Sequence, residues 1–118
     1  MFKNPTFSRA IGNALNGLYH FFLHEKNGQR QFAVAVLIIA SAISYHISAT
    51  EWLCILMCIG AVLCLEMINS CIEKLCDVVQ EEYHPLIKII KDVSAGAVLF
   101  ASFISVITGC IIFLPKII

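Results

Sequence analysis

Three carboxylates and one carboxamide recur at helical spacing within an otherwise apolar part of the sequence. They are Glu66, Asn69, Glu73 and Asp77. Because an α-helix turns by about 100° per residue, all four side chains fall within about 60° of one direction and form what we call the acidic stripe. Carboxylates can remove a proton from a substrate or bind Mg²⁺ together with phosphate oxygens. The acidic stripe is therefore a candidate catalytic and metal-binding surface.

The acidic stripe reaches two depths along its helix. At a rise of about 1.5 Å per residue, Glu66 lies roughly 10 Å from Glu73 along the axis. Glu66 is flanked by apolar residues on both sides. A carboxylate at the centre of a membrane span costs about 3 kcal/mol or more, so such a residue is a candidate functional residue. The alternative is that Glu66 and Asn69 form hydrogen bonds to neighbouring helices and hold the spans together.

Further charged residues lie on either side of the acidic stripe. Residues 66–92 hold six of the eight acidic residues of the chain. Lys91 and Asp92 stand directly before four small residues, 94–97, which allow a ligand or another helix to approach the backbone. Glu25 lies where the N-terminal segment meets the first apolar segment, and taken alone it would be a solvated interfacial acid. Lysines beside carboxylates suit phosphoryl transfer, although the sequence has no Walker A, GxGxxG or HRD motif.

Membrane helices are the elements that must position these residues. Of the 118 residues, 59% are hydrophobic and 14% are charged, which is more apolar side chain than a soluble domain of this size can bury. A helix that spans the bilayer needs about 20 residues, with about 17 as the lower limit. Three apolar segments approach or exceed this length. We therefore predict an all-α integral membrane fold with three transmembrane helices, at residues 31–48, 52–76 and 92–114.

The remaining segments are predicted to be short connections and one surface helix. Residues 5–28 carry apolar residues at three- and four-residue spacing, which predicts an amphipathic helix in the headgroup plane. Ser48 or Thr50 is available as the N-cap of the helix after the first span. The six cysteines contain no CxxC pair and are interpreted as small apolar side chains. Residues 1–118 are predicted to form a single membrane domain.

The positions of the eight lysines and arginines predict the orientation in the membrane. Four precede the first span, none lies in residues 46–51, and three lie in residues 74–92. Because cytoplasmic loops are enriched in these cations, the N-terminus and the 74–92 connection are predicted to be cytoplasmic and the C-terminus to lie outside. A cleavable signal peptide is not expected, because the first 31 residues contain no uninterrupted apolar run.

Four sequence blocks, taken together, resemble one known family. The blocks are Glu66-Met-Ile-Asn69-Ser-Cys-Ile-Glu73, Asp77, Glu82-Tyr83-His84-Pro85 and Lys91-Asp92-Val-Ser-Ala-Gly-Ala-Val. They closely resemble the motif of the prokaryotic diacylglycerol kinase family, membrane enzymes that phosphorylate lipid alcohols with MgATP. The similarity extends from Phe7 to Lys116. The resemblance implies a homotrimer in the bacterial inner membrane, with active sites shared between subunits near the cytoplasmic face.

The same resemblance implies a role for each matching residue. Glu66 matches the catalytic base, which takes the proton of the lipid hydroxyl as that hydroxyl attacks the γ-phosphate of ATP. Glu25 and Glu73 match the acids that hold Mg²⁺ with ATP. Further ATP contacts match Arg9, Asn69, Asp77, Glu82, Tyr83, His84, Lys91 and Asp92, and lipid contacts match Glu66, Arg30 and Ala95, the last at a position where some members carry serine.

Finer similarities predict the lipid substrate. Glu73-Lys74, Tyr83-His84-Pro85-Leu86 and Phe113-Leu114-Pro115-Lys116-Ile117 resemble the undecaprenol kinase branch more than the diacylglycerol kinase branch. Undecaprenol is therefore the expected substrate, with diacylglycerol as the alternative. No nucleic-acid partner is expected.

Two non-enzymatic functions are the remaining alternatives. In the first, the acidic stripe conducts protons or cations across the membrane. Such a path would have to cross the whole span, yet residues 52–63 contain no ionisable side chain apart from cysteine. In the second, the chain is an inactive relative that serves as a scaffold, although every acid of the family motif is present.

Overall fold

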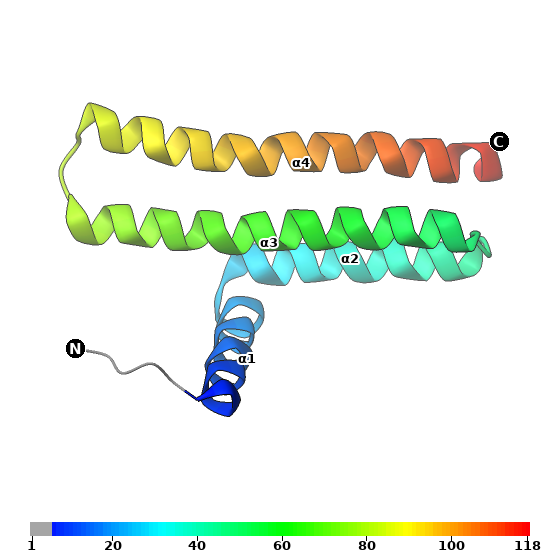
Figure 1. Cartoon of the computed structure of the whole chain (residues 1–118). Coiled ribbons are helices and arrows are strands. Elements are labelled where there is room, and N and C mark those ends of the chain that lie inside the picture. Colours follow the sequence, from blue (N-terminus) through cyan, green and yellow to red (C-terminus); the bar gives the residue numbers. More distant parts are fainter. Residues whose placement is uncertain (1–5) are drawn as a thin grey trace.

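The computed structural model describes residues 6–118, which form four α-helices and no β-strand (Figure 1). The helices are α1 (Phe7–His24), α2 (Lys26–Ser44), α3 (Ala49–Val79) and α4 (Pro85–Ile117). The predicted all-α fold is confirmed. Residue 5, where the predicted surface helix begins, lies outside the described residues.

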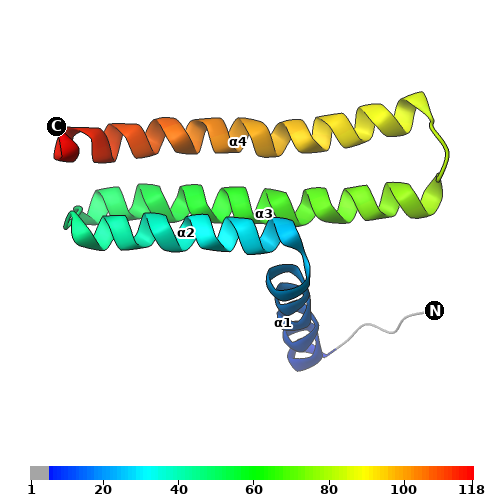
Figure 2. The ribbon, with the colours of Figure 1, turned by 180° about the vertical axis from the view of Figure 1, so that it is seen from behind.

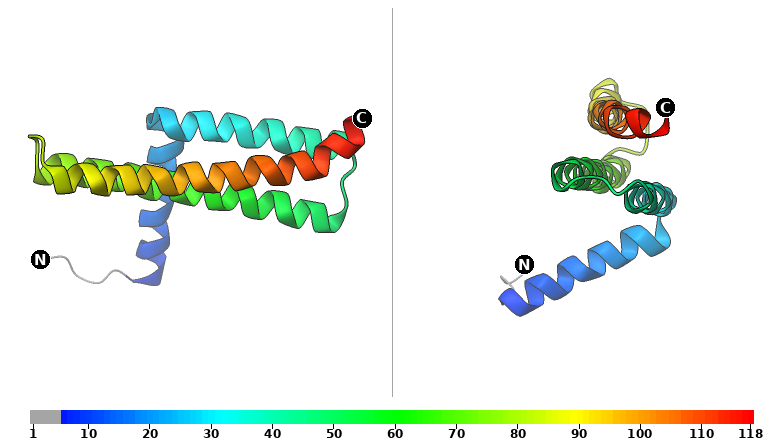
Figure 3. Two further views of the ribbon diagram at one scale, coloured as in Figure 1. Left: turned by 90° about the horizontal axis from the view of Figure 1, so that it is seen from above. Right: turned by 90° about the vertical axis from the view of Figure 1, so that its right-hand side faces the viewer.

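The α3 helix is the centre of the bundle. It packs against both α2 and α4, which lie on different sides of it in the end-on view of Figure 3. Figure 2 shows from behind that α1 crosses the bundle at a steep angle and that α3 and α4 extend past the start of α2. We call the end of the bundle with the α3–α4 loop, residues 80–84, the loop end, and the opposite end with the α2–α3 turn the turn end.

The corner between α1 and α2 interrupts the predicted surface helix 5–28. Residue Glu25 adopts extended backbone angles, φ −113° and ψ 133°, and both ends α1 and precedes α2. Gly28 is buried in this corner, and a Cβ atom there would overlap the carbonyl oxygen of Phe21. Phe21 is itself only 3% exposed. The two helices can pack this closely because residue 28 has no side chain.

The turn end is closed by a helix cap and a small apolar cluster. Ser48 Oγ accepts a hydrogen bond from the Glu51 N–H at 3.2 Å, and Glu51 Oε1 accepts one from the Ser48 N–H at 2.9 Å. This capping box fixes the start of α3, so Ser48 is the N-cap and Thr50 lies inside the helix. The buried residues that join α2, the turn, α3 and α4 here are Ala42, Ile47, Ile55 and Ile112.

Two helices of the described chain are long and apolar enough to cross a membrane, α3 with a mean hydropathy of 2.1 and α4 with 2.5 over 18 residues. Only 22% and 11% of those windows are buried within the chain, so most of their apolar surface faces outward. The α2 helix falls short because its first turns are polar, from Lys26 to Gln31. Its role as a third span remains a prediction.

Both long helices extend beyond the predicted spans at the loop end. The α3 helix continues to Val79, and α4 begins at Pro85. Proline suits the first turn of a helix because its missing N–H needs no partner there. His84 Nδ1 accepts a hydrogen bond from the Leu86 N–H at 3.1 Å and caps this end. The polar residues between 77 and 92 thus lie on two adjacent helix ends and the loop that joins them.

Candidate functional site

Glu25 is held at the α1–α2 corner by side chains of α1 and α3. Its Oε1 accepts a hydrogen bond from Ser70 Oγ. Its Oε2 lies 3.0 Å from Lys74 Nζ and 3.7 Å from His20 Nε2. The Ser70 hydrogen bond, with a further contribution from Lys74, lowers the pKa of Glu25 below its usual range although partial burial opposes this shift. Glu25 is therefore an ionised carboxylate fixed against α3.

The acidic stripe lies on the loop-end half of α3, and its members have polar partners. Glu66 Oε1 accepts a hydrogen bond from Gln31 Nε2 of α2 at 3.3 Å. Asn69 is 6% exposed and donates from Nδ2 to Glu73 Oε1 at 3.3 Å. Asn69 Oδ1 is buried, and no donor within residues 6–118 reaches it.

A pocket of about 270 Å³ opens beside Glu25, and we call it the corner pocket. It is lined by Glu25, Lys26, Asn27, Ser70, Glu73, Lys74 and Asp77. Mg²⁺ in nucleotide sites binds one or two carboxylates and takes its other ligands from phosphate and water. Glu25 and Glu73 fit this donor set. Residues 6–118 contain no group of three or more His, Cys, Asp or Glu side chains arranged to hold a metal ion, so such an ion would depend on phosphate and water ligands.

A second pocket of about 350 Å³ lies at the α3–α4 loop, and we call it the loop pocket. Lys91 Nζ lies 2.6 Å from Asp77 Oδ1 in its wall. Lys88 Nζ lies 2.6 Å from Asp92 Oδ2. Asp77 lines both pockets, so they are direct neighbours. The predicted ATP contacts that the loop pocket brings together are Asp77, Glu82, Tyr83, His84, Lys91 and Asp92.

Five predicted site residues line neither pocket: Arg9, Arg30, Glu66, Asn69 and Ala95. Glu66 and Asn69 remain on the acidic stripe of α3, whereas the other three lie away from both the stripe and the pockets. Arg9 is exposed in the first turn of α1, roughly 24 Å along the helix from Glu25. Arg30 is exposed on α2 and Ala95 on α4, and neither lines the corner pocket or the loop pocket. Within a single chain, these three residues do not join the others.

The sequence did not predict the residues that hold Glu25 and Glu66 in place. Gln31 holds Glu66, whereas Ser70 and Lys74 hold Glu25. The first two contacts join positions 35 and 45 residues apart, so no local spacing signals them. For Lys74 the only available signal is a lysine directly after a predicted metal ligand.

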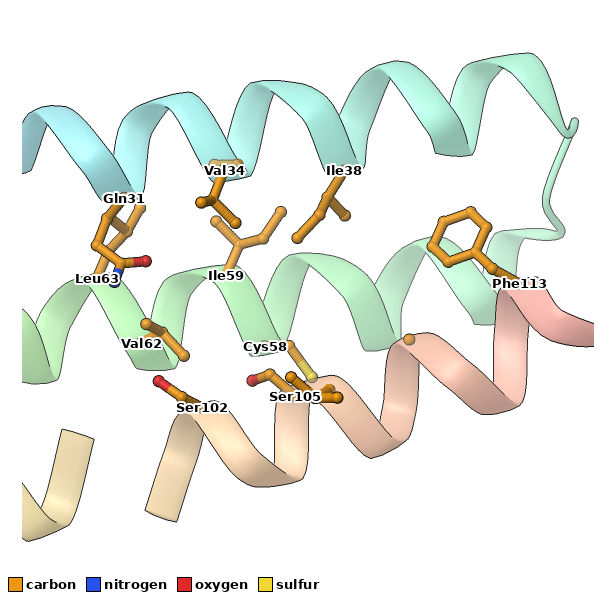
Figure 4. A pocket seen from close by; sticks show the side chains of 13 residues that line it. Gln31, Val34, Ile38, Cys58, Ile59, Val62, Leu63, Ser102, Ser105 and Phe113 are labelled. Atoms are coloured by element: carbon orange, nitrogen blue, oxygen red, sulfur yellow. The ribbon is translucent and has the colours of Figure 1, made fainter. Parts of the chain in front are cut away.

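An apolar groove of about 360 Å³ runs between α2, α3 and α4 (Figure 4). Gln31 lies at one end and Phe113 at the other. The oxygen-bearing side chains of its lining are Gln31, Ser102 and Ser105. Because Gln31 also donates to Glu66, the groove ends beside the first carboxylate of the acidic stripe. A hydrocarbon chain that carries a hydroxyl group would match these surfaces.

Comparison with known proteins identifies the family. Residues 12–113 match the prokaryotic diacylglycerol kinase family. The chain belongs to this family. It is therefore a lipid kinase with ATP as co-substrate, and its long, outward-facing apolar helices are those of a membrane protein. The predicted lipid kinase is confirmed.

Relatives of this lipid kinase include an undecaprenol kinase and diacylglycerol kinases. The undecaprenol kinase of Bacillus subtilis (strain 168) is 36% identical over 110 residues, covering 93% of this chain and 89% of the relative. The diacylglycerol kinase of Synechocystis sp. is 33% identical over 100 residues, covering 84% of this chain and 57% of the relative. The diacylglycerol kinase of Escherichia coli (strain K12) is 29% identical over 104 residues, covering 88% of this chain and 85% of the relative.

Proposed function

We propose that this lipid kinase transfers the γ-phosphoryl group of ATP to the primary hydroxyl of a membrane lipid alcohol in a Mg²⁺-dependent reaction, with undecaprenol as the lipid. The observation that carries the proposal is the position of Glu66. It shares the acidic stripe with Glu73, and through Gln31 it adjoins the apolar groove. A lipid hydroxyl and a nucleotide phosphate can therefore approach the same helix face.

Glu66 is the general base in this proposal. Its carboxylate takes the proton of the lipid hydroxyl while the hydroxyl oxygen bonds to the γ-phosphorus and the bond from that phosphorus to the ADP oxygen breaks. Gln31 occupies Glu66 Oε1, which leaves Oε2 to accept the proton. Positioning of this kind lowers the barrier because the base and the hydroxyl no longer have to find each other.

Glu25 and Glu73 are the residues proposed to hold Mg²⁺, and Asn69 keeps Glu73 in place. When bound, the ion would neutralise negative charge on the phosphates. The corner pocket would then hold the phosphates, and the neighbouring loop pocket would hold the rest of the nucleotide.

We further propose a homotrimer of three-span subunits in the bacterial inner membrane, with both pockets and the N-terminus cytoplasmic and the C-terminus outside. The distant position of Arg9 supports shared sites, because a neighbouring subunit could supply the cation that a single chain leaves far from Glu25. Native mass spectrometry of the detergent-extracted protein should give three times the mass of the chain. A mass equal to one chain would contradict the trimer.

Undecaprenol is preferred over diacylglycerol because the Bacillus subtilis undecaprenol kinase is 36% identical to this chain, against 33% and 29% for the diacylglycerol kinases of Synechocystis sp. and Escherichia coli. A competition assay tests the choice. Purified protein receives radiolabelled ATP, Mg²⁺ and equal amounts of the two lipids, and the labelled products are separated by chromatography. Undecaprenyl phosphate should dominate. A predominance of phosphatidic acid would reverse the choice of lipid, and no labelled lipid from folded protein that binds ATP would contradict the proposed reaction.

A further inference from the structure

Glu25 already has a partner on each of its oxygens. Ser70 Oγ donates to Oε1, and the Lys74 ammonium lies 3.0 Å from Oε2. His20 Nε2 approaches the same oxygen at 3.7 Å. A metal ion that binds Glu25 through Oε2 therefore has to displace the Lys74 ammonium, because a dication and an ammonium group repel each other at this distance.

Lys74 is well placed to change partners. Its side chain is 57% exposed, and it lines the corner pocket together with Glu73 and Asp77. Lysine has a flexible four-carbon stem and a compact charge, so its ammonium can move by several ångströms at little cost. Of the two other acids in the pocket, Asp77 already has Lys91 as its partner at 2.6 Å, and Glu73 is the second proposed ligand of the metal ion. A displaced Lys74 would therefore need a new anion within the pocket.

We propose that Lys74 is a phosphate-binding residue of the nucleotide site, held on Glu25 until a divalent cation and a nucleotide bind together. The cation takes Oε2 of Glu25, and the Lys74 ammonium moves to a phosphate oxygen of the nucleotide. No covalent bond changes, and each charged group exchanges one partner for another. This inference rests on the proposed function, since it requires a metal nucleotide in the corner pocket.

A purely structural Lys74 would behave differently. If the residue only fastened the α1–α2 corner to α3, its loss would loosen Glu25 and weaken the binding of metal and nucleotide together. If Lys74 exchanges partners, its loss frees Glu25 for the metal ion and removes a cation from the phosphates. The affinity for the metal ion alone then rises, and the affinity for the metal nucleotide falls.

The test uses the full chain in lipid nanodiscs with the substitution Lys74→Gln. Binding of Mn²⁺ alone is followed by electron paramagnetic resonance, and binding of MgATP by equilibrium dialysis. Affinity for Mn²⁺ should rise about threefold, as expected for the loss of one exposed ion pair. Affinity for MgATP should fall about tenfold, as expected for the loss of one charge-assisted contact. Lys74→Arg, which keeps the positive charge, should restore MgATP affinity to within about threefold of the unmodified protein.

Lys116→Gln is the matched control, because it removes the same charge at the turn end, where Lys116 pairs with Glu51. Both of its affinities should equal those of the unmodified protein. Affinities that fall together in Lys74→Gln, or that do not change, overturn the inference. If the unmodified protein binds no MgATP at all, it is the proposed function that fails.

Discussion

At each end of α3, an acidic side chain is paired with a lysine of α4. At the turn end, Glu51 lies 2.9 Å from Lys116. At the loop end, Asp77 lies 2.6 Å from Lys91. The surroundings of the two pairs differ. Glu51 also accepts the Ser48 N–H, so both of its oxygens have partners and its charge is balanced. Asp77 instead lines two pockets that it shares with further acids.

The packing around the two ends shows the same contrast. The turn end contains a buried apolar cluster that includes Ala42 and Ile55, 0% and 3% exposed. Near the loop end, the buried side chains of α3 include the polar Asn69 and Ser70, and both hold a carboxylate. An ion pair between α3 and α4 is thus no mark of a functional site by itself. The loop end is distinguished by additional carboxylates held beside a pocket by neutral donors.

Neutralising one acidic residue at each end of α3 should separate the proposed catalytic role of the loop end from the structural role of the turn end most sharply. Glu73→Gln should lower lipid phosphorylation about a hundredfold, because it removes a proposed metal ligand. Glu51→Gln should leave phosphorylation unchanged but lower the unfolding temperature, because it weakens both the capping box and the pair with Lys116. Lipid phosphorylation assays and thermal unfolding of both variants measure these two effects. Equal loss of activity in both would remove the functional distinction between the ends.

A smaller effect is expected from the α1–α2 corner, which brings Glu25 to the loop-end site. Gly28→Ala places a Cβ atom against the Phe21 carbonyl, and overpacking of this kind destabilises by about 1–3 kcal/mol. Glu25 should then lose its contacts with α3, and MgATP affinity should fall about tenfold, as read by equilibrium dialysis.

Gly17→Ala serves as the control for the corner, since a Cβ atom at Gly17 meets nothing within 4 Å. It should stabilise α1 by about 1 kcal/mol, because alanine favours the helix, and leave nucleotide binding unchanged. Unaltered binding in Gly28→Ala would show that the site does not depend on the corner.

Local sequence signals predicted the helices and the spacing of the acids, and they narrowed the N-cap of α3 to Ser48 or Thr50. The stripe from Glu66 to Asp77 follows from the helical period alone. The structure decides for Ser48, whose side chain forms the capping box with Glu51. The break at Glu25 could not be predicted in this way. It depends on Gly28 meeting Phe21 across the corner, and helical periodicity carries no information about contacts between helices.

Sequence patterns also could not predict the hydrogen-bond partners of Glu66 and Glu25. Gln31 meets Glu66, and Ser70 meets Glu25, only after α1, α2 and α3 have packed. Family resemblance named Arg9 as a nucleotide contact, but helix geometry leaves it roughly 24 Å from Glu25 within one chain. The proposal that a neighbouring subunit supplies Arg9 cannot be derived from the periodicity of a single sequence.

Paramagnetic broadening by Mn²⁺ bound with a non-hydrolysable ATP analogue tests the central claim most directly, because it shows which end of α3 holds the metal nucleotide. Glu51 and Glu73 are roughly 33 Å apart along α3, so the two ends give separate signals. In nuclear magnetic resonance spectra of the full chain, the backbone amides of residues 70–77 and 82–92 should broaden, while those of residues 48–52 and 112–116 should remain sharp. Broadening centred on residues 48–52, or none at residues 70–77 with the analogue bound, would contradict the account.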